Sequence, residues 1–259
     1  MRPTPALLSF ACFVLLSACD GYDLGRTCVG SVCQCTTVSE CDFNAMNGCG
    51  PDSRDCVLSC NSGADCSGAC GTSCTMSTND SQAELRAGER AYLSCNGSST
   101  CALSFGASSA VSCNGTSSCK LTADTASSVS CNGKSSCTLD AGEKSSISCN
   151  QEANCTFTAA PATQASCNGS ATCTVSAAKG AQLSCNEKAS CLFTAEPDVL
   201  VSCNGEATCQ ITCQGSCAAL CAETSHCELA CPGDAAPTAF TGATGCRVPA
   251  TTTTSATEG

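Results

Sequence analysis

The sequence predicts an all-β fold: a disulfide-rich parallel β-solenoid, right- or left-handed, of about eight 18-residue coils behind an irregular Cys-rich N-terminal cap. Three observations carry this prediction: cysteine pairs at a fixed period, apolar residues spaced by two, and 32 cysteines in 259 residues. Eighteen residues are too few for a propeller blade or a helix pair, but they suit one solenoid coil. A string of independent disulfide loops is the alternative, and the unbroken period argues against it.

Residues 1–18 have the pattern of a signal peptide. One arginine precedes an apolar run at residues 6–16 that is too short to span a bilayer. The run ends in Leu16-Ser17-Ala18-Cys19, which resembles the lipobox of bacterial lipoproteins. The resemblance implies cleavage before Cys19 and lipidation of its thiol. We therefore expect an exported chain, lipid-anchored to the inner or the outer membrane of the cell envelope; an ordinary signal peptide with a chance cysteine is the alternative.

A short tether is expected at residues 19–27, followed by a Cys-rich cap at residues 28–92. The residues at 58–61, Leu-Ser-Cys-Asn, match the start of a repeat, and those at 74–77, Cys-Thr-Met-Ser, match its second strand. This pattern predicts one degenerate coil with an insertion. Residues 75–92 carry most of the local charge, and a short helix or loop is expected there. The pairing of the cysteines between Cys28 and Cys74 stays open.

The regular repeats occupy residues 93–231. Within one unit, Val129 and Cys131 point to one side, as do Cys137 and Leu139, because alternate residues of a strand share a face. Each unit therefore holds two short strands joined by a tight corner. Two cysteines lie six residues apart in every unit, and the eight pairs are Cys95 and Cys101, Cys113 and Cys119, Cys131 and Cys137, Cys149 and Cys155, Cys167 and Cys173, Cys185 and Cys191, Cys203 and Cys209, and Cys221 and Cys227.

We expect these cysteines to pair within their own unit, because pairing between coils would join the coils two by two and break their equivalence. A bridge of this size stabilises the fold by about 2.4 kcal/mol in the chain-entropy picture. Cys213 and Cys231 occupy equivalent positions one coil apart, so a between-coil bridge is predicted there. Residues 232–259 are expected to form a C-terminal cap and a disordered Thr-rich tail.

Seven consecutive units carry an asparagine directly after the first cysteine. Asparagine tolerates a left-handed backbone at a corner and can hydrogen-bond to a stacked neighbour, so a structural ladder is favoured over a ligand site. The ladder consists of Asn96, Asn114, Asn132, Asn150, Asn168, Asn186 and Asn204.

Composition argues against several functions. The net charge is −11, aromatic residues make up 3%, and there is no Trp, so the basic stripes and stacking rings of nucleic-acid binding are missing. The five-residue gap between paired cysteines is wrong for a tight metal clamp, and no metal, cofactor or catalytic residue is predicted. The single histidine, His226, has no catalytic partners at any recognisable spacing, so we do not expect an enzyme.

The Cys-x5-Cys coil, its Ser and Thr flanks, and the segment CNSGADCSGACGTSC at residues 60–74 resemble the disulfide-braced β-solenoid antifreeze proteins of beetles. That family has shorter coils and two regular Thr ladders, so the resemblance implies ice binding only as an alternative. Here one outward column is nearly all hydroxyl, and we call it the hydroxyl column: Ser104, Thr122, Asp140, Thr158, Ser176, Thr194 and Thr212.

The favoured function is a lipid-anchored structural, adhesion or recognition module of the cell envelope without catalytic activity. Its partners are the membrane, through the lipid anchor, and an envelope or extracellular partner that the sequence does not identify. A solenoid enzyme acting on polysaccharide is a third hypothesis, and it requires a cleft with paired carboxylates.

Overall fold

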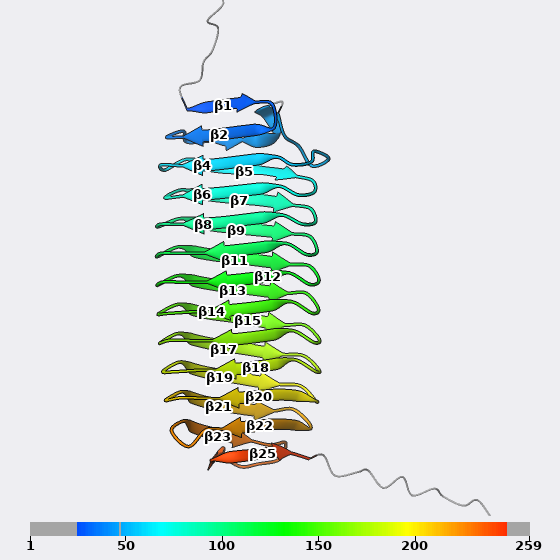
Figure 1. Cartoon of the computed structure of the whole chain (residues 1–259), viewed down its shortest axis with the longest axis vertical. Coiled ribbons are helices and arrows are strands. Elements are labelled where there is room, and N and C mark those ends of the chain that lie inside the picture. Colours follow the sequence, from blue (N-terminus) through cyan, green and yellow to red (C-terminus); the bar gives the residue numbers. More distant parts are fainter. Residues whose placement is uncertain (1–24, 47, 248–259) are drawn as a thin grey trace, which may run out of the picture.

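The computed structural model describes residues 25–46 and 48–247, and it shows a stack of coils with the first and last strands at opposite ends (Figure 1). The predicted all-β parallel β-solenoid is confirmed, with a spacing of about 18 residues between coils. It has ten full coils, each with one strand in each of two sheets, preceded by a partial coil at residues 32–42 that pairs in parallel with the first full coil. Between β1 and β25 the stack measures roughly 55–60 Å, given about 4.8 Å between neighbouring strands.

Two long sheets form the sides of the stack. The 13-stranded sheet contains β1 Arg26–Val29, β2 Val32–Thr36, β4 Val57–Asn61, β6 Thr75–Asn79, β8 Tyr92–Asn96, β10 Ala110–Cys113, β12 Ser128–Cys131, β14 Ser146–Cys149, β16 Gln164–Cys167, β18 Gln182–Cys185, β20 Val199–Cys203, β22 Cys217–Cys221 and β25 Gly242–Cys246. The 12-stranded sheet contains β3 Cys41–Asp42, β5 Asp65–Cys70, β7 Gln82–Ala87, β9 Thr100–Phe105, β11 Ser118–Ala123, β13 Ser136–Ala141, β15 Asn154–Ala159, β17 Thr172–Ala177, β19 Ser190–Ala195, β21 Thr208–Cys213, β23 His226–Ala230 and β24 Thr238–Phe240.

The core is a narrow interior filled by the alternating residues of both sheets. In β13 the side chains of Cys137, Leu139 and Ala141 point inward and are at most 3% exposed. Thr138 and Asp140 of the same strand face solvent. Each coil sets the same residue types above those of its neighbour, as in Leu121 beside Leu139. The two-residue alternation in the sequence therefore predicts which side chains are buried.

Small residues fill the interior at the corners. Ser117, Ser135 and Ala153 occupy one corner position in successive coils and are fully buried. Ser127 and Thr163 occupy the opposite corner in the same way. Because the two sheets approach each other closely at these corners, the interior has room there only for Ala, Ser or Thr in most coils. This explains why the repeat is rich in small residues.

The solenoid begins earlier than the sequence predicts. Residues 57–87 form two full coils, β4 with β5 and β6 with β7, where a cap with one degenerate coil was expected. The helix or loop expected at residues 75–92 is wrong, because β6 and β7 pair in parallel with their neighbours on both sides. In this coil Thr78 and Ala83 take the two cysteine positions, and both are buried. The irregular part of the cap is confined to a hairpin of β1 and β2, the short β3, and a 3-10 helix at Phe43–Met46.

Antiparallel strands cover the C-terminal end of the stack. β25 pairs antiparallel with β22, and β24 pairs antiparallel with β23, whereas the ten coils pair in parallel. These strands satisfy the open edges of the last coil, which would otherwise invite pairing with another chain. The C-terminal cap predicted after residue 231 is therefore a pair of edge-covering strands. The Thr-rich tail from residue 248 lies outside the described residues.

Candidate functional site

The asparagine ladder is continuous in the structure. The side-chain amide of each asparagine donates to the carbonyl oxygen of the asparagine one coil earlier, over Nδ2–Oδ1 distances of 2.8–2.9 Å. Six such bonds join the seven residues from Asn96 to Asn204. Several amides also donate to the serine two residues earlier, as Asn132 does to Ser130 at 3.2 Å. The ladder's amides are thus used within the stack, which supports its structural interpretation.

The left-handed backbone at this corner belongs to the residue after the asparagine. Gly115, Gly133 and Gly169 have φ of 74–76°, and in coils without glycine Gln151 and Glu187 have φ of 65° and 62°. A Cβ at Gly133 would lie 2.8 Å from the carbonyl oxygen of Gly115. The expectation that asparagine supplies the left-handed backbone is therefore wrong. Its role in the structure is to hydrogen-bond to the asparagines of the neighbouring coils.

The coil of β6 and β7 has a corner one residue shorter, closed by Asp80. The Asp80 carboxylate accepts hydrogen bonds from the backbone N–H of Ser98 at 2.9 Å and from its hydroxyl at 3.0 Å. These two bonds, the backbone one first, hold the pKa of Asp80 below its ordinary value. Gly97 lies against this carboxylate, where a Cβ would clash with it.

The outer face of the 13-stranded sheet has no charged side chain from β4 to β22. Beside the ladder runs a second column, which we call the serine column: Ser59, Ser77, Ser94, Ser112, Ser130, Ser148, Ser166, Ser184 and Ser202. Ser59 lies in the repeat start already visible at residues 58–61, whereas Ser77 escapes the sequence period because the coil at residues 75–87 has no cysteine to mark it. A column of exposed side chains completes the face, among them Tyr92, Gln164, Gln182 and Leu200.

A shallow groove of about 560 Å³ lies on this face toward its C-terminal end. Gln164, Gln182, Leu200 and Leu220 contribute to its lining, and both leucines are about half exposed. Uncharged polar and apolar groups thus share this part of the face.

The hydroxyl column lies on the outer face of the other sheet, where its seven members stack in register. That face is less uniform, because Glu84, Arg86, Lys120 and Asp140 all project from it. From β15 to β21 its outward residues are uncharged and mostly Thr or Ser.

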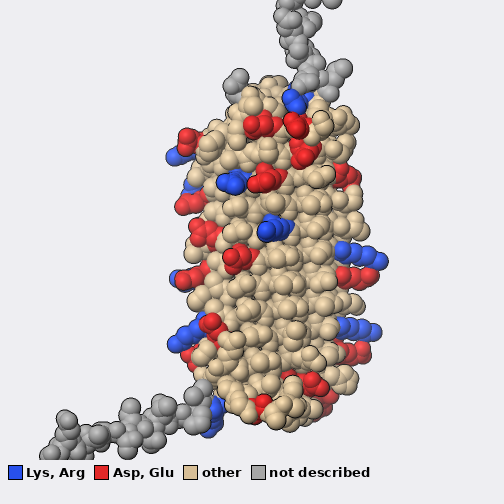
Figure 2. Space-filling view, turned by 180° about the vertical axis from the view of Figure 1, so that it is seen from behind, with Lys and Arg blue, Asp and Glu red and all other residues tan. Residues whose placement is uncertain are grey.

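Charged side chains gather along the two long edges of the stack, with fewer on the face between them (Figure 2). Three ion pairs connect neighbouring coils there: Lys134 with Glu152 at 3.3 Å, Lys179 with Asp198 at 3.3 Å, and Lys188 with Glu206 at 3.6 Å. All are well exposed, and such pairs typically contribute less than about 1 kcal/mol. The edges therefore carry charge without contributing much stability.

The interior holds a stack of disulfides. All eight pairs of the regular repeat close within their own coil, over Cα–Cα distances of 6.2–6.6 Å. In the N-terminal part the bonds are Cys28–Cys33, Cys35–Cys41, Cys49–Cys56, Cys60–Cys66 and Cys70–Cys74.

The predicted bridge between Cys213 and Cys231 is absent among the described disulfides, since Cys213 pairs with Cys217 and Cys231 with Cys246. Cys213 ends β21 and Cys217 begins β22, so their bond closes one tight corner. The pairing of β21 with β23 ends at Thr212, so Cys231 has left the register before it could reach Cys213. Cys231 instead fastens the capping strand β25.

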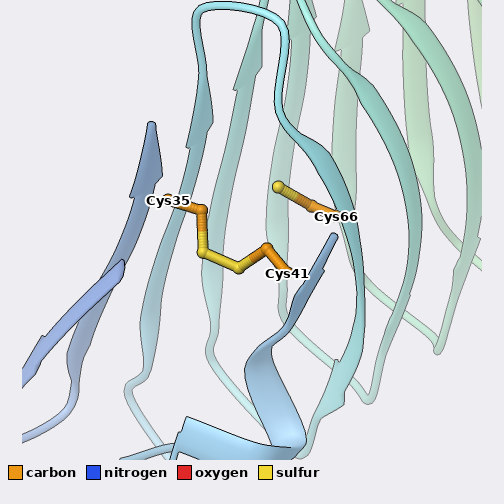
Figure 3. A group of neighbouring side chains, drawn as sticks. All are labelled: Cys35, Cys41 and Cys66. Carbon is orange, nitrogen blue, oxygen red and sulfur yellow. A yellow bond between two sulfur atoms is a disulfide. The ribbon is translucent and has the colours of Figure 1, made fainter. Parts of the chain in front are cut away.

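Sulfurs of neighbouring coils come close together. In Figure 3 the Cys35–Cys41 disulfide lies beside Cys66 of the next coil, and the three Sγ atoms are within 4.8 Å of one another. The same holds for Cys95, Cys101 and Cys119, and for three further groups up to Cys173. Such spacing suits metal ligands, but a metal binds the thiolate, and these sulfurs are all in disulfides.

His226 is exposed at the start of β23, and it borders a pocket with Glu228 and Phe240. Cys19 and the signal-peptide pattern lie outside the described residues. No helix in residues 25–46 and 48–247 is long and apolar enough to cross a membrane.

Fold and surfaces together define a disulfide-braced parallel β-solenoid with one uncharged face. No protein-family model matches the chain, and comparisons with curated proteins and with solved structures find no similar protein.

Proposed function

We propose that this protein is a lipid-anchored, non-catalytic rod of the bacterial cell envelope that binds an uncharged partner on its 13-stranded sheet. The observation that carries the proposal is the absence of charge on that outer face from β4 to β22, in a chain of net charge −11. A neutral surface binds a neutral partner without the cost of removing water from charges.

The course of the chain supports an anchored rod. The lipobox-like Leu16-Ser17-Ala18-Cys19 precedes β1, and β1 is the first strand of the stack. An anchor at Cys19 would attach the rod by its N-terminal end, which leaves the C-terminal cap roughly 55–60 Å from that end. Both outer faces would then remain accessible along the whole height of the rod.

The anchor is tested by Cys19→Ala in the full chain expressed in a bacterial host. We expect the wild type to take up a radiolabelled fatty acid and to sediment with membranes, and Cys19→Ala to do neither. Equal labelling of the two proteins would refute lipidation at this position.

The face is tested with the double variant Ser146→Glu and Gln182→Glu, which puts two charges on the exposed column of the 13-stranded sheet. The matched control, Thr156→Glu and Thr174→Glu, puts the same charges on the other sheet. Binding of purified protein to washed envelope fragments should fall at least tenfold for the first variant only. Equal binding by both variants, or no binding by the wild type, would contradict the proposal.

Ice binding is the second candidate, and a specific observation favours it. The segment of the 12-stranded sheet from β15 to β21 presents stacked hydroxyls with no charge on four neighbouring coils. If this surface binds ice, the wild type shows thermal hysteresis that Thr174→Lys abolishes and Gln182→Lys on the opposite sheet preserves. Normal ice growth in the presence of the wild type would eliminate this candidate.

A further inference from the structure

We propose that the stacked disulfides form a relay, in which one thiol, once generated, passes from coil to coil by thiol–disulfide exchange. The relay goes beyond the binding function proposed above and does not depend on it. It follows from the arrangement of the sulfurs, because exchange requires a thiolate beside the disulfide that it attacks.

The sulfurs of consecutive coils overlap in a regular way. Each close group contains both cysteines of one coil and the second cysteine of the next, all with Sγ atoms within 4.8 Å. Four such groups in the regular repeat are Cys95, Cys101 and Cys119; Cys113, Cys119 and Cys137; Cys131, Cys137 and Cys155; and Cys149, Cys155 and Cys173. Every group shares one cysteine with the group that follows it, so the contacts are continuous over these coils.

One step of the relay balances without any added oxidant. The Cys101 thiolate attacks Sγ of Cys119, a Cys101–Cys119 bond forms, and the Cys113–Cys119 bond breaks. The bonding electron pair leaves on Cys113, which becomes the new thiolate. The count of disulfides and thiols is unchanged, and only the position of the thiol moves.

Further steps repeat the same chemistry. Cys113 belongs to the next close group and can attack Cys137, which releases Cys131. Cys131 can attack Cys155, which releases Cys149. The thiol thus advances one coil, about 4.8 Å along the rod, at each step. The first thiol comes from an external thiol or phosphine that reduces one disulfide.

The coil of β6 and β7 interrupts the relay. Thr78 stands in register between Cys60 and Cys95, and Ala83 between Cys66 and Cys101. The nearest disulfides on its two sides are therefore two strand spacings apart, about 9.6 Å, which is beyond sulfur contact. On the N-terminal side the group in Figure 3 lets Cys66 attack Cys41 and release Cys35. Residues 25–46 and 48–247 thus contain two separate relays.

The test uses two matched variants of the full chain, each lacking one cysteine. Cys95→Ser leaves Cys101 free in the long relay, and Cys60→Ser leaves Cys66 free in the short one. After incubation at pH 8, acid quenching and alkylation, mass spectrometry locates the free thiol. In Cys95→Ser we expect it to be spread over Cys101, Cys113, Cys131, Cys149 and Cys167, with new Cys101–Cys119 and Cys113–Cys137 bonds. In Cys60→Ser it should stay among Cys66, Cys41 and Cys35.

A thiol that stays on Cys101 alone, or that crosses residues 75–87 in Cys60→Ser, would overturn the proposal. The wild type gives an independent measurement if a variant fails to fold. Reduction of a single disulfide by a phosphine at pH 3 should free both cysteines of one coil. Raising the pH to 8 should then produce the between-coil bonds named above, and unchanged pairs at pH 8 would refute the relay.

Discussion

Asn150 lies in the middle of the asparagine ladder, and its replacement by alanine measures what the ladder contributes. Its side chain donates to Asn132 and accepts from Asn168, both at 2.8 Å. Asn150→Ala removes these two hydrogen bonds, so that Asn132 Oδ1 loses its donor from the next coil and the Asn168 amide keeps only its bond to Ser166. A hydrogen bond of this kind contributes about 0.5–1.5 kcal/mol, so we expect local destabilisation of about 1–3 kcal/mol.

Amide hydrogen exchange measured by NMR suits this prediction, because a solenoid opens coil by coil and exchange reports the stability of each coil separately. Since 1.4 kcal/mol is a factor of ten, protection of the amides from 131 to 168 should fall about 5- to 150-fold. The control is Asn204→Ala at the ladder's end, which removes one bond only, and its effect should be about half in free energy. Unchanged exchange in Asn150→Ala, or an equal effect at Asn204, would refute a cooperative structural ladder.

Three further predictions concern packing, titration and the corners. In guanidinium titrations, Phe193→Ala should lower the free energy of unfolding by about 3–5 kcal/mol, because this side chain is only 1% exposed. Leu192→Ala is the control: its side chain is 44% exposed, and its removal should change the free energy of unfolding by less than about 0.5 kcal/mol. Asp80→Asn should lower the melting temperature at pH 7. Because the pKa of Asp80 is lowered in the folded state, the carboxylate stabilises the fold above about pH 3.9, and this stabilisation disappears as the pH falls through the lowered pKa. The melting temperatures of the two proteins should therefore converge in acid. A difference that stays constant with pH would contradict this. Gly115→Ala should lower the melting temperature more than Gly180→Ala does. Both glycines have similar φ, 76° and 74°, but only at Gly115 would a Cβ meet the backbone of the neighbouring coil. Equal melting temperatures of the two variants would exclude that clash.

Regular spacing made most of the fold predictable. Strand positions and inward faces in residues 93–227, and the within-coil pairing of the eight cysteine pairs of the repeat, follow from the two-residue alternation and the 18-residue period, because a solenoid repeats one local environment. The coil at residues 75–87 escaped prediction for a physical reason. Thr78 and Ala83 fill the disulfide position, and the corner at Asp80 is one residue short, so neither period nor cysteine marks this coil.

The ends of the stack were also harder to predict than its middle. Cys213 and Cys231 are one period apart, yet the chain leaves the register after Ala230, where β24 and β25 fold back antiparallel. Spacing alone does not show where a repeat stops. Similarly, the serine column and the groove at Leu200 and Leu220 depend on which columns face outward and how they curve, which only the assembled sheets reveal.

The parallel stacking of near-identical coils makes the height of this molecule an adjustable quantity. Removal of one 18-residue unit, such as residues 146–163, would bring β16 onto β12, whose inward residues match in type. The inward columns and the asparagine ladder would keep their partner types and both capping structures would remain in place, while the Lys134–Glu152 ion pair would be lost. Duplication or loss of whole units therefore changes length by about 4.8 Å without a new fold having to be found. One coil of 18 residues corresponds to 54 nucleotides of the gene, so gain or loss of a segment of that length changes the height of the rod by one coil.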